Sequence, residues 1–594
     1  MKLTLDRTID SDLLVIGGGI AGLRAAVAGA RCGARTVLVI KGTLGKSGSS
    51  DAAAIGISWQ AADGCGGPDD SPEVHYQDVM HAAQGMADAR LARIIASEAV
   101  ERFHELESWG LKMHRDPAGR KPHFGGYACF GSQPRAHGVP AAANGSHTGN
   151  MTGCLRQQLP PDLVSVHEST AIIDLLVQGG ACVGALGVDR DGAFVVYRAG
   201  AVVLAAGGAG QIFPITQSPP AMTGDGYAMA FRAGAELTNM EFMQYMILAV
   251  RGPSLRQELG GSFWAVNPVL RNGLGEESLS RYLPPGVTAA EAMWARSLHS
   301  PFSCHDVSRW VDIAIHSEIR EGRGTPSAHM VVDFSEVDPK RSRRPRPMFW
   351  PPPAEMSLPV RQISVAHSGH AVNGGIRVDE WGRTRVPGLL AAGEVIAGPH
   401  GADRLGGGMV SACNVFGARA GRSGAEHAKA AGRPALQPEA LEKPAARVAA
   451  FGRGKEADLA AIRRALRETT RRHLVVIRNA DGLRELLSSL NPLQFEALAD
   501  VPVRDARDLV RVLETDSMLF TVAVMARAAL LRTESRGSHY REDYPEKDNV
   551  RWQTSILWHN RNGEPVASFG RYRQDPAATV QMGELRETIT QGIG

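Results

Sequence analysis

The seven cysteines of this 594-residue sequence are scattered along it, and no two of them stand in a C-x-x-C pair. Such pairs are typical of zinc ribbons and of iron–sulfur clusters held by thiolates, and regular spacing is typical of disulfide frameworks. We therefore expect a protein of a reducing compartment that has no metal site and no iron–sulfur cluster of its own. The cysteines are Cys32, Cys65, Cys129, Cys154, Cys182, Cys304 and Cys413.

Long hydrophobic runs and an excess of one charge are also missing. No apolar stretch approaches the roughly 18 residues of a membrane-spanning helix, and the start of the chain is too polar for a signal peptide. With 65 Lys and Arg against 62 Asp and Glu, the net charge is +3, which does not indicate nucleic acid or an anionic membrane as a partner. We expect a cytoplasmic protein without direct membrane insertion, built from about two to four domains.

Residues 12–41 have the pattern of a strand, a tight turn, a helix and a second strand. Gly17, Gly19 and Gly22 fall in G-x-G-x-x-G spacing between the two apolar strands. In that spacing the first glycine allows the turn, the second lets a pyrophosphate approach, and the third lets the helix pack closely on the strand. The second strand ends in Ile40-Lys41, where an acid for the ribose hydroxyls is expected. The stretch therefore predicts a dinucleotide site but leaves NAD, NADP and FAD open.

Buried strands that end in glycine recur and divide the chain. One ends at Gly207-Gly208, and another, residues 388–393, runs into Glu394. Between them proline, arginine and tryptophan become frequent and the parallel-sheet rhythm stops, which indicates an inserted domain. From residue 438 the sequence turns helical. The predicted division is 1–235 and 362–436 for the nucleotide-binding domain, 236–361 for the insertion, and 437–594 for a helical C-terminal domain with an irregular tail.

Taken in order, motifs along nearly the whole chain resemble the flavoprotein subunit family of succinate dehydrogenase and fumarate reductase, which includes L-aspartate oxidase and the alpha subunit of adenylylsulfate reductase. The resemblance implies FAD rather than a nicotinamide cofactor. It also implies an α/β fold, with a Rossmann-like FAD-binding domain, an inserted α+β capping domain and a helical C-terminal domain. The motifs are VIGGGIAG at 15–22, TGDGYAMAFRAGA at 223–235, EIREGRG at 318–324, HAVNGGI at 370–376, VPGLLAAGE at 386–394, HGADRLGG at 400–407 and ESRGSHYREDYPEKD at 534–548.

The resemblance also implies which residues hold FAD. The glycines of the first motif would bind the pyrophosphate, the small residues 47–56 would run beside the isoalloxazine ring, and Glu394 would hydrogen-bond ribityl hydroxyls. The histidine that links flavin covalently in the family falls at Ser50, so we expect non-covalent FAD. The predicted cofactor-binding residues are Gly17, Gly19, Gly22, Lys41, Ser47, Gly48, Ser50, Ala54, Gly56, Gly207, Gly208, Asp225, Gly393, Glu394, Met409 and Val410.

Three residues are predicted to be catalytic. His370 and Arg404 stand where the family grips a substrate carboxylate beside the flavin, and a guanidinium matches the geometry and charge of a carboxylate. Arg309 is the nearest match to the family's proton-transferring arginine, although it lies one residue out of register. His367 and His370 have i, i+3 spacing, but without further ligands this pair does not indicate a metal site.

One departure from the family concerns the substrate. Met246 stands where succinate and fumarate enzymes have a substrate-binding histidine, and the Thr-Glu pair that normally follows is not recognisable in residues 257–266. A thioether removes a hydrogen bond to the far end of a dicarboxylate. We therefore expect a larger or partly apolar acid in place of plain succinate or fumarate.

These observations predict an FAD-dependent oxidoreductase that transfers a hydride between flavin N5 and an organic acid or activated C–C bond. Because the sequence shows no second redox centre, electrons must be exchanged with a separate iron–sulfur or ferredoxin-like subunit, with a quinone pathway or with oxygen. Two alternatives stay open: an amino-acid oxidase like L-aspartate oxidase, and a flavin-carrying electron-transfer or assembly subunit whose substrate site is degenerate.

Overall fold

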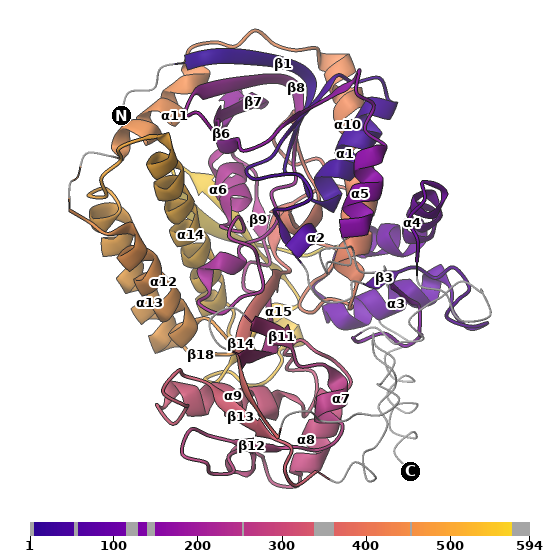
Figure 1. The fold of residues 1–594 in the computed structure, drawn as a ribbon, viewed down its shortest axis with the longest axis vertical. Coiled ribbons are helices and arrows are strands. Elements are labelled where there is room, and N and C mark those ends of the chain that lie inside the picture. The colour runs from indigo at the N-terminus through magenta and orange to yellow at the C-terminus, as the bar shows by residue number, and fades with distance from the viewer. Residues whose placement is uncertain are drawn as a thin grey trace.

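The computed structural model describes residues 5–52, 58–113, 129–138, 149–251, 255–337, 361–451, 454 and 456–572. Two predicted cofactor residues, Ala54 and Gly56, lie outside these ranges. Figure 1 shows a sheet-based upper body, a smaller domain below it, and a layer of helices along one side.

A seven-stranded sheet forms the upper body, in the order β5-β2-β1-β8-β7-β6, with β16 also paired to β8. The pairs β1–β2, β1–β8, β2–β5 and β8–β16 are parallel, as expected for a Rossmann-like core. Leu13, Leu14 and Val15 of β1 are fully buried, because helices cover a parallel sheet on its faces. The strands are β1 (Leu5–Ile16), β2 (Thr36–Val39), β5 (Val164–His167), β6 (Ala171–Gln178), β7 (Ala181–Val188), β8 (Phe194–Leu204) and β16 (Leu389–Ala391).

Helices α1 (Ile20–Arg31) and α10 (Gly408–Ala431) lie side by side against this sheet (Figure 1). Glycines allow both contacts. Gly17 has a φ of +114°, which favours glycine, and a Cβ on Gly22 would overlap the carbonyl oxygen of Gly17. Along α10, a Cβ on Gly421 would overlap the backbone of Ala25 in α1. The glycine spacing predicted from the sequence therefore sets the distance between α1 and the end of β1.

The smaller domain is built on a five-stranded sheet in the order β11-β10-β14-β13-β12. It has its own apolar core, centred on Trp264, Ile315 and Val332. The predicted boundary after residue 361 falls at the start of β14, which pairs with β10 and β13, so the division into domains stays a prediction. Its elements are β10 (Met243–Arg251), β11 (Leu255–Glu258), β12 (Val269–Arg271), β13 (Met330–Asp333), β14 (Gln362–Val372), α7 (Gly261–Trp264), α8 (Ala289–Arg296) and α9 (Arg309–Arg320).

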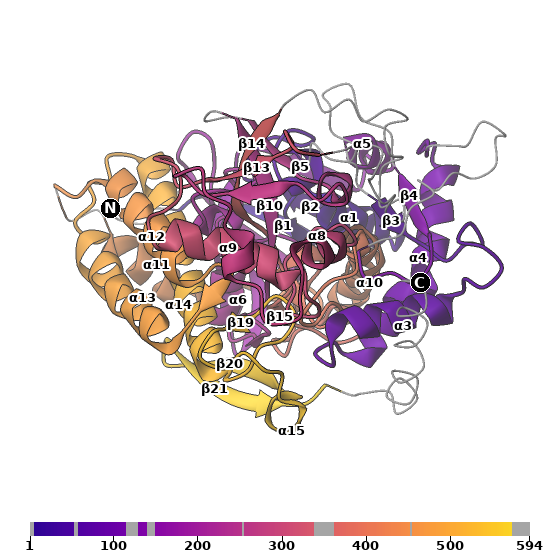
Figure 2. The same ribbon diagram turned by 90° about the horizontal axis from the view of Figure 1, so that it is seen from below.

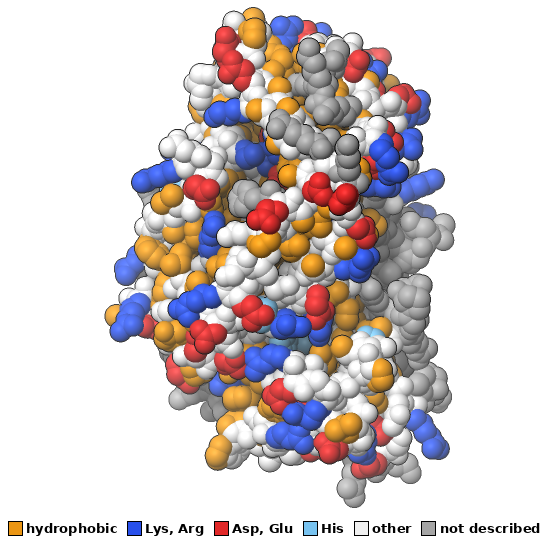
Figure 3. Space-filling view, turned by 90° about the vertical axis from the view of Figure 1, so that its left-hand side faces the viewer, with side chains coloured by type: hydrophobic (Ala, Val, Ile, Leu, Met, Phe, Trp, Pro, Cys, Tyr) orange, Lys and Arg blue, Asp and Glu red, His pale blue; other side chains and the backbone are white. Residues whose placement is uncertain are grey.

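The C-terminal part is helical, as predicted. The amphipathic run predicted at 458–472 is confirmed as α12, whose N-cap Asp458 accepts a hydrogen bond from Ala460 N. Figure 2 shows these helices gathered at one side of the molecule. On the face in Figure 3, acidic and basic side chains alternate and neither sign is segregated. The helices are α11 (Glu439–Ala450), α12 (Leu459–His473), α13 (Ala480–Pro492) and α14 (Ala506–Leu531).

The tail of the chain adds strands to a third sheet. Strand-like sequence near Thr554 and Val566 is confirmed as β20 and β21, in the order β17-β15-β9-β20-β21. The strands of this sheet are β9 (Leu237–Thr238), β15 (Gly375–Arg377), β17 (Ile396–Ala397), β20 (Ser555–Arg561) and β21 (Glu564–Gly570). Further elements are α2 (Ser49–Ala52), α3 (Pro72–Ala83), α4 (Ala89–Ser108), α5 (Gly149–Gln157), α6 (Asp225–Arg232), α15 (Asn549–Trp552), β3 (Ser58–Gln60), β4 (Ala136–Gly138), β18 (Ile477–Arg478) and β19 (Tyr540–Arg541).

We predict that Gly22→Ala destabilises the protein, because the added methyl group pushes α1 away from the turn after β1. Overpacking of this kind costs about 1–3 kcal/mol. Thermal or urea unfolding of the purified protein measures the loss.

The matched control is Gly153→Ala in α5, where a Cβ meets nothing within 4 Å. Alanine is a better helix former than glycine by about 0.5–1 kcal/mol, so this variant should be as stable as the parent or slightly more so. Equal stability of the two variants would contradict the close approach at Gly22.

Candidate active site

A cavity of about 890 Å³ lies at the carboxyl ends of β1, β2 and β8 and extends to β10 and β14 of the smaller domain. Its volume is in the range of sites for small molecules and cofactors. Ligands bind at this edge in open α/β sheets. It brings together most of the residues predicted from the sequence: Gly17, Gly19, Lys41, Ser47, Gly48, Ser50, Gly207, Asp225, His370, Gly393, Glu394, Arg404, Met409 and Val410.

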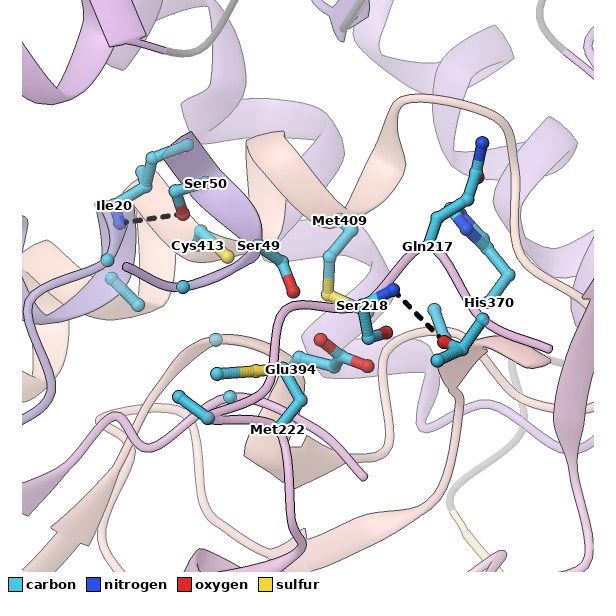
Figure 4. Close-up of a pocket in the computed structure, with 18 of the residues that line it drawn as sticks. Ile20, Ser49, Ser50, Gln217, Ser218, Met222, His370, Glu394, Met409 and Cys413 are labelled. Atoms are coloured by element: carbon cyan, nitrogen blue, oxygen red, sulfur yellow. Dashed lines mark hydrogen bonds between the residues drawn. The ribbon is translucent and has the colours of Figure 1, made fainter. Parts of the chain in front are cut away.

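At one end of the cavity stands the N-terminus of α1. The Ser50 hydroxyl accepts a hydrogen bond from Ile20 N at 3.1 Å (Figure 4), and a Cβ on Gly19 would lie 3.1 Å from the same hydroxyl. The first turn of α1 holds no acidic residue. The positive end of the helix dipole therefore faces the cavity without an internal counter-charge, which suits a phosphate group.

Lys41 supports the wall of the cavity through ion pairs. Its Nζ lies 2.7 Å from Asp225 Oδ2 and 2.9 Å from Glu514 Oε1, and it donates to Thr223 Oγ1 at 3.0 Å. Although burial opposes its charge, these two carboxylates raise the pKa of Lys41. The lysine that replaces the expected acid at the end of β2 thus ties β2 to α6 and α14.

In the middle of the cavity, Glu394 depends on two glycines. A Cβ on Gly208 would overlap its carboxyl group, and Gly207 has a φ of +74°. Glu394 Oε1 accepts a hydrogen bond from Val372 N at 3.2 Å, and burial raises the pKa of this carboxyl to about 7. Figure 4 shows Glu394, Met222 and Met409 from three separate segments around the same space.

The predicted catalytic pair lies beside this middle region. Arg404 is 6% exposed, and its Nε and Nη2 donate to Gln244 Oε1 at 3.1 and 2.7 Å. Burial, and then the charge of Arg404, lowers the pKa of His370 to about 3. His370 is therefore a neutral hydrogen-bonding group at neutral pH, and Arg404 supplies the positive charge.

The far end of the cavity contains an acid that the sequence analysis missed. Glu258 ends β11 and pairs with Leu248 of β10, the strand that also carries Met246. Both side chains line the cavity, together with Ser300 and Phe263. Burial raises the pKa of Glu258. An acid at the end of a short strand was the available signal, but only the pairing of β11 with β10 brings it to the site.

Not every predicted residue lines this space. Arg309, the first residue of α9, donates to the Cys304 carbonyl oxygen at 3.4 Å and lies over the Trp310 ring. It is not among the described residues of the cavity wall, so the structure does not bring it together with His370 and Arg404. Gly22 and Gly208 act one step back, through close packing. His367 is hydrogen-bonded to Asp312 Oδ1 at 3.0 Å.

Comparison with known proteins defines the class. A family model described as "FAD binding domain" matches residues 12–410, and one described as "Fumarate reductase flavoprotein C-term" matches residues 463–585. The protein is therefore an FAD-dependent oxidoreductase. Within the described ranges, no helix is both long and apolar enough to cross a membrane.

Individual relatives define the family. A protein of Methanothermobacter marburgensis named as part of the fumarate reductase (CoM/CoB) is 33% identical over 94% of this chain and 98% of its own length. L-aspartate oxidase of Bacillus subtilis is 29% identical over 93% of this chain and 95% of its own length. The structure of Mycobacterium smegmatis Sdh1 in complex with UQ1 has a TM-score of 0.82 at 27% identity and covers 98% of both chains. The chain belongs to the succinate dehydrogenase and fumarate reductase flavoprotein family, as its motifs predicted.

The residues present fit FAD. The helix end beside Ser50 offers N–H groups for a pyrophosphate, and the approach of Gly208 to Glu394 leaves no room there for a side chain. Among the described wall residues the one histidine is His370. Burial raises the pKa of Cys129 to about 11 and that of Cys413 to about 12, so both wall cysteines are held as unreactive thiols.

We predict that acid or heat releases free FAD from the purified yellow protein, because Ser50 offers no imidazole to the flavin. After denaturation and centrifugation, absorbance and fluorescence of the supernatant measure the released flavin. Flavin fluorescence that stays with the denatured polypeptide on a gel would contradict this prediction.

Proposed function

We propose that this oxidoreductase acts on an organic acid whose carboxylate is bound by Arg404 and His370 and whose far end is uncharged. The observation that carries the proposal is the state of Arg404. Its guanidinium is buried against the neutral amide of Gln244, and within the described ranges it forms no ion pair with a carboxylate. Burial of an uncompensated charge costs several kcal/mol, and a bound carboxylate offsets that cost.

The neighbouring groups support a monoanion. FAD, when bound, supplies the N5 position that accepts or gives a hydride. Arg404 orients the carboxylate and stabilises negative charge that develops next to it. His370, which is neutral, hydrogen-bonds the same carboxylate without adding charge. Gln244 holds the guanidinium in place from β10, so the smaller domain contributes to the anion site.

The far end of the cavity supports an uncharged group. Because burial raises the pKa of Glu258, the carboxyl group is a hydrogen-bond donor while it is protonated. Met246 offers a thioether beside it. A carbonyl, amide or hydroxyl oxygen on the substrate satisfies that donor, whereas a second carboxylate meets no positive charge from either side chain.

The electrons of this reaction require a second protein or an external acceptor. We propose a separate iron–sulfur or ferredoxin-like subunit, and two features support this. The sequence shows no cysteine pattern for a cluster, and the Methanothermobacter relative is named as one subunit of an assembly. The same scattered cysteines support a cytoplasmic location.

Two relatives support alternative substrates. The name of the Methanothermobacter protein favours fumarate, with Glu258 then meeting its second carboxyl group. The name of the Bacillus protein favours oxidation of an amino acid such as L-aspartate. Release of hydrogen peroxide in air during turnover distinguishes an oxidase from an enzyme that needs a separate electron partner.

Loss of either anion-binding group should remove most turnover. We predict that Arg404→Ala and His370→Ala keep FAD but lose about 10²–10³ in kcat/KM, since removal of one charge-assisted donor costs about 2.7–4 kcal/mol in the transition state. A dye-coupled assay with a panel of mono- and dicarboxylic acids measures the change. Arg422→Ala is the matched control, because that arginine pairs with Glu426 on the exposed surface of α10. Near-normal kinetics in both site variants would place the anion site elsewhere.

The unmodified enzyme should have negligible activity with fumarate and succinate, in either direction with an artificial dye. The reason is the unpaired second carboxylate beside Met246, whose burial costs several kcal/mol. Met246→His should improve dicarboxylate binding if it changes it. Fast turnover of either compound by the unmodified protein would contradict this prediction and favour fumarate as the substrate.

Glu258→Gln serves as the control for the far end, because an amide keeps a donor but does not titrate. As pH rises through the raised pKa of Glu258, the parent enzyme loses its donor and gains a negative charge. Affinity for a neutral-ended acid should therefore fall with pH in the parent and stay level in the variant.

A further inference from the structure

Outside the active-site cavity, three side chains of metal-binding type meet beside a two-stranded sheet. Asp63 and Cys65 follow β3, and His137 lies in β4, opposite Trp59 in the antiparallel pair. One ligand-type atom from each of the three lies within 4.8 Å of the others. The Asp63 and His137 side chains are fully buried and Cys65 is partly exposed, so the cluster is accessible from the side of Cys65.

The distances match the edges of a zinc tetrahedron. His137 Nε2 lies 3.2 Å from Asp63 Oδ1, and Cys65 Sγ lies 3.5 Å from Asp63 Oδ2. With zinc bonds of about 2.0 Å to nitrogen or oxygen and about 2.3 Å to sulfur, a tetrahedron has a nitrogen–oxygen edge of about 3.3 Å and an oxygen–sulfur edge of about 3.5 Å. We propose that Asp63, Cys65 and His137 bind a structural zinc ion.

A second observation is the crowding of acceptors around one nitrogen. His137 Nε2 lies 3.3 Å from the Ala61 carbonyl oxygen as well as 3.2 Å from Asp63 Oδ1. One N–H proton cannot satisfy both oxygens with good geometry, whereas a cation between them is attracted by all the lone pairs. The Ala61 carbonyl oxygen or a water molecule completes the coordination shell.

The charges of the cluster suit a divalent cation. Against the effect of burial, the hydrogen bond to His137 lowers the pKa of Asp63, so its carboxylate is ionised at neutral pH. A thiolate, an imidazole and a carboxylate form a mixed ligand set of the kind that zinc binds, while magnesium and calcium prefer oxygen alone.

The loop sequence brings Cys65 to this position. Gly64 and Gly67 have φ values of +91° and +105°, and Cys65 N donates to Asp63 Oδ1 at 3.2 Å. His137 packs against Phe103 of α4, with ring centroids 4.3 Å apart. The sequence analysis expected no metal, because it considered spacing within short motifs and His137 is far from Cys65 along the chain.

The site has a structural consequence for the flavin domain. Gln60 of β3 exchanges two hydrogen bonds with the Ser411 hydroxyl of α10, so β3 is fixed on one side by the flavin-domain helix. Zinc at Asp63 and Cys65 fixes the chain on the other side of β3 to β4. The ion therefore anchors the segment that follows the flavin-binding loop.

The test uses the full-length flavoprotein, stripped with a chelator, dialysed, and then supplied with zinc chloride. Mass spectrometry of the metal content should give about one zinc per chain, and X-ray absorption should show one sulfur at about 2.3 Å and nitrogen or oxygen at about 2.0 Å. Because zinc binds the folded state, chelation should lower the melting temperature. Less than stoichiometric zinc, or a shell without sulfur, overturns the proposal.

Two variants and one control assign the ligands. Cys65→Ser and Asp63→Asn should weaken zinc binding by more than the about 10–100-fold that loss of a supporting group costs, while bound FAD shows that each variant is folded. Cys32→Ser, at an exposed cysteine, should bind zinc like the parent. Unchanged zinc binding in both site variants overturns the proposal. Should both variants fail to fold, the absorption spectrum of the parent still decides, since only a shell with sulfur supports the site.

Discussion

The positive charge of Arg404, buried without a carboxylate partner in the described structure, is the constraint on which the site depends. The arginine lies on the segment between β17 and α10, in the flavin-binding part, but its guanidinium is held by Gln244 from β10 of the smaller domain. Either part alone would leave the charge exposed to water, where it would bind an anion weakly. The anion site therefore exists only where the two domains meet.

Acids near this charge are kept neutral instead of being paired with it. Burial raises the pKa of Glu394 to about 7, and burial raises the pKa of Asp403 well above its usual range despite hydrogen bonds from Ser303 and Gln84. Burial also holds the pKa of His400 well below its usual range. A low-dielectric wall of uncharged groups leaves the field of the guanidinium largely unopposed. The same wall explains why the site favours one anion over two.

Sequence reasoning predicted those parts of the site that depend on local geometry. The glycines at 17, 19 and 22 could be interpreted because their spacing fixes a turn and a helix start, and His370 and Arg404 could be assigned because their motifs are contiguous. Gln244 and Glu258 were missed because their positions follow from the pairing of β10 with β14 and β11. Such pairing joins segments far apart in sequence. Arg309 shows the converse limit, since a one-residue shift at the start of a helix redirects the whole side chain.

The C-terminal motif also has a physical role in positioning the site. Glu534 and Arg536 belong to that motif, and both are buried in an ionic network with Arg532 and Glu241. Glu241 lies just before β10, so this network fixes the start of the strand that carries Gln244 and Met246. Removal of one member of such a buried network costs about 3–5 kcal/mol, because an uncompensated charge is left behind. The helical C-terminal part thus holds β10 against the flavin-binding part, and through Gln244 it holds Arg404 at the anion site.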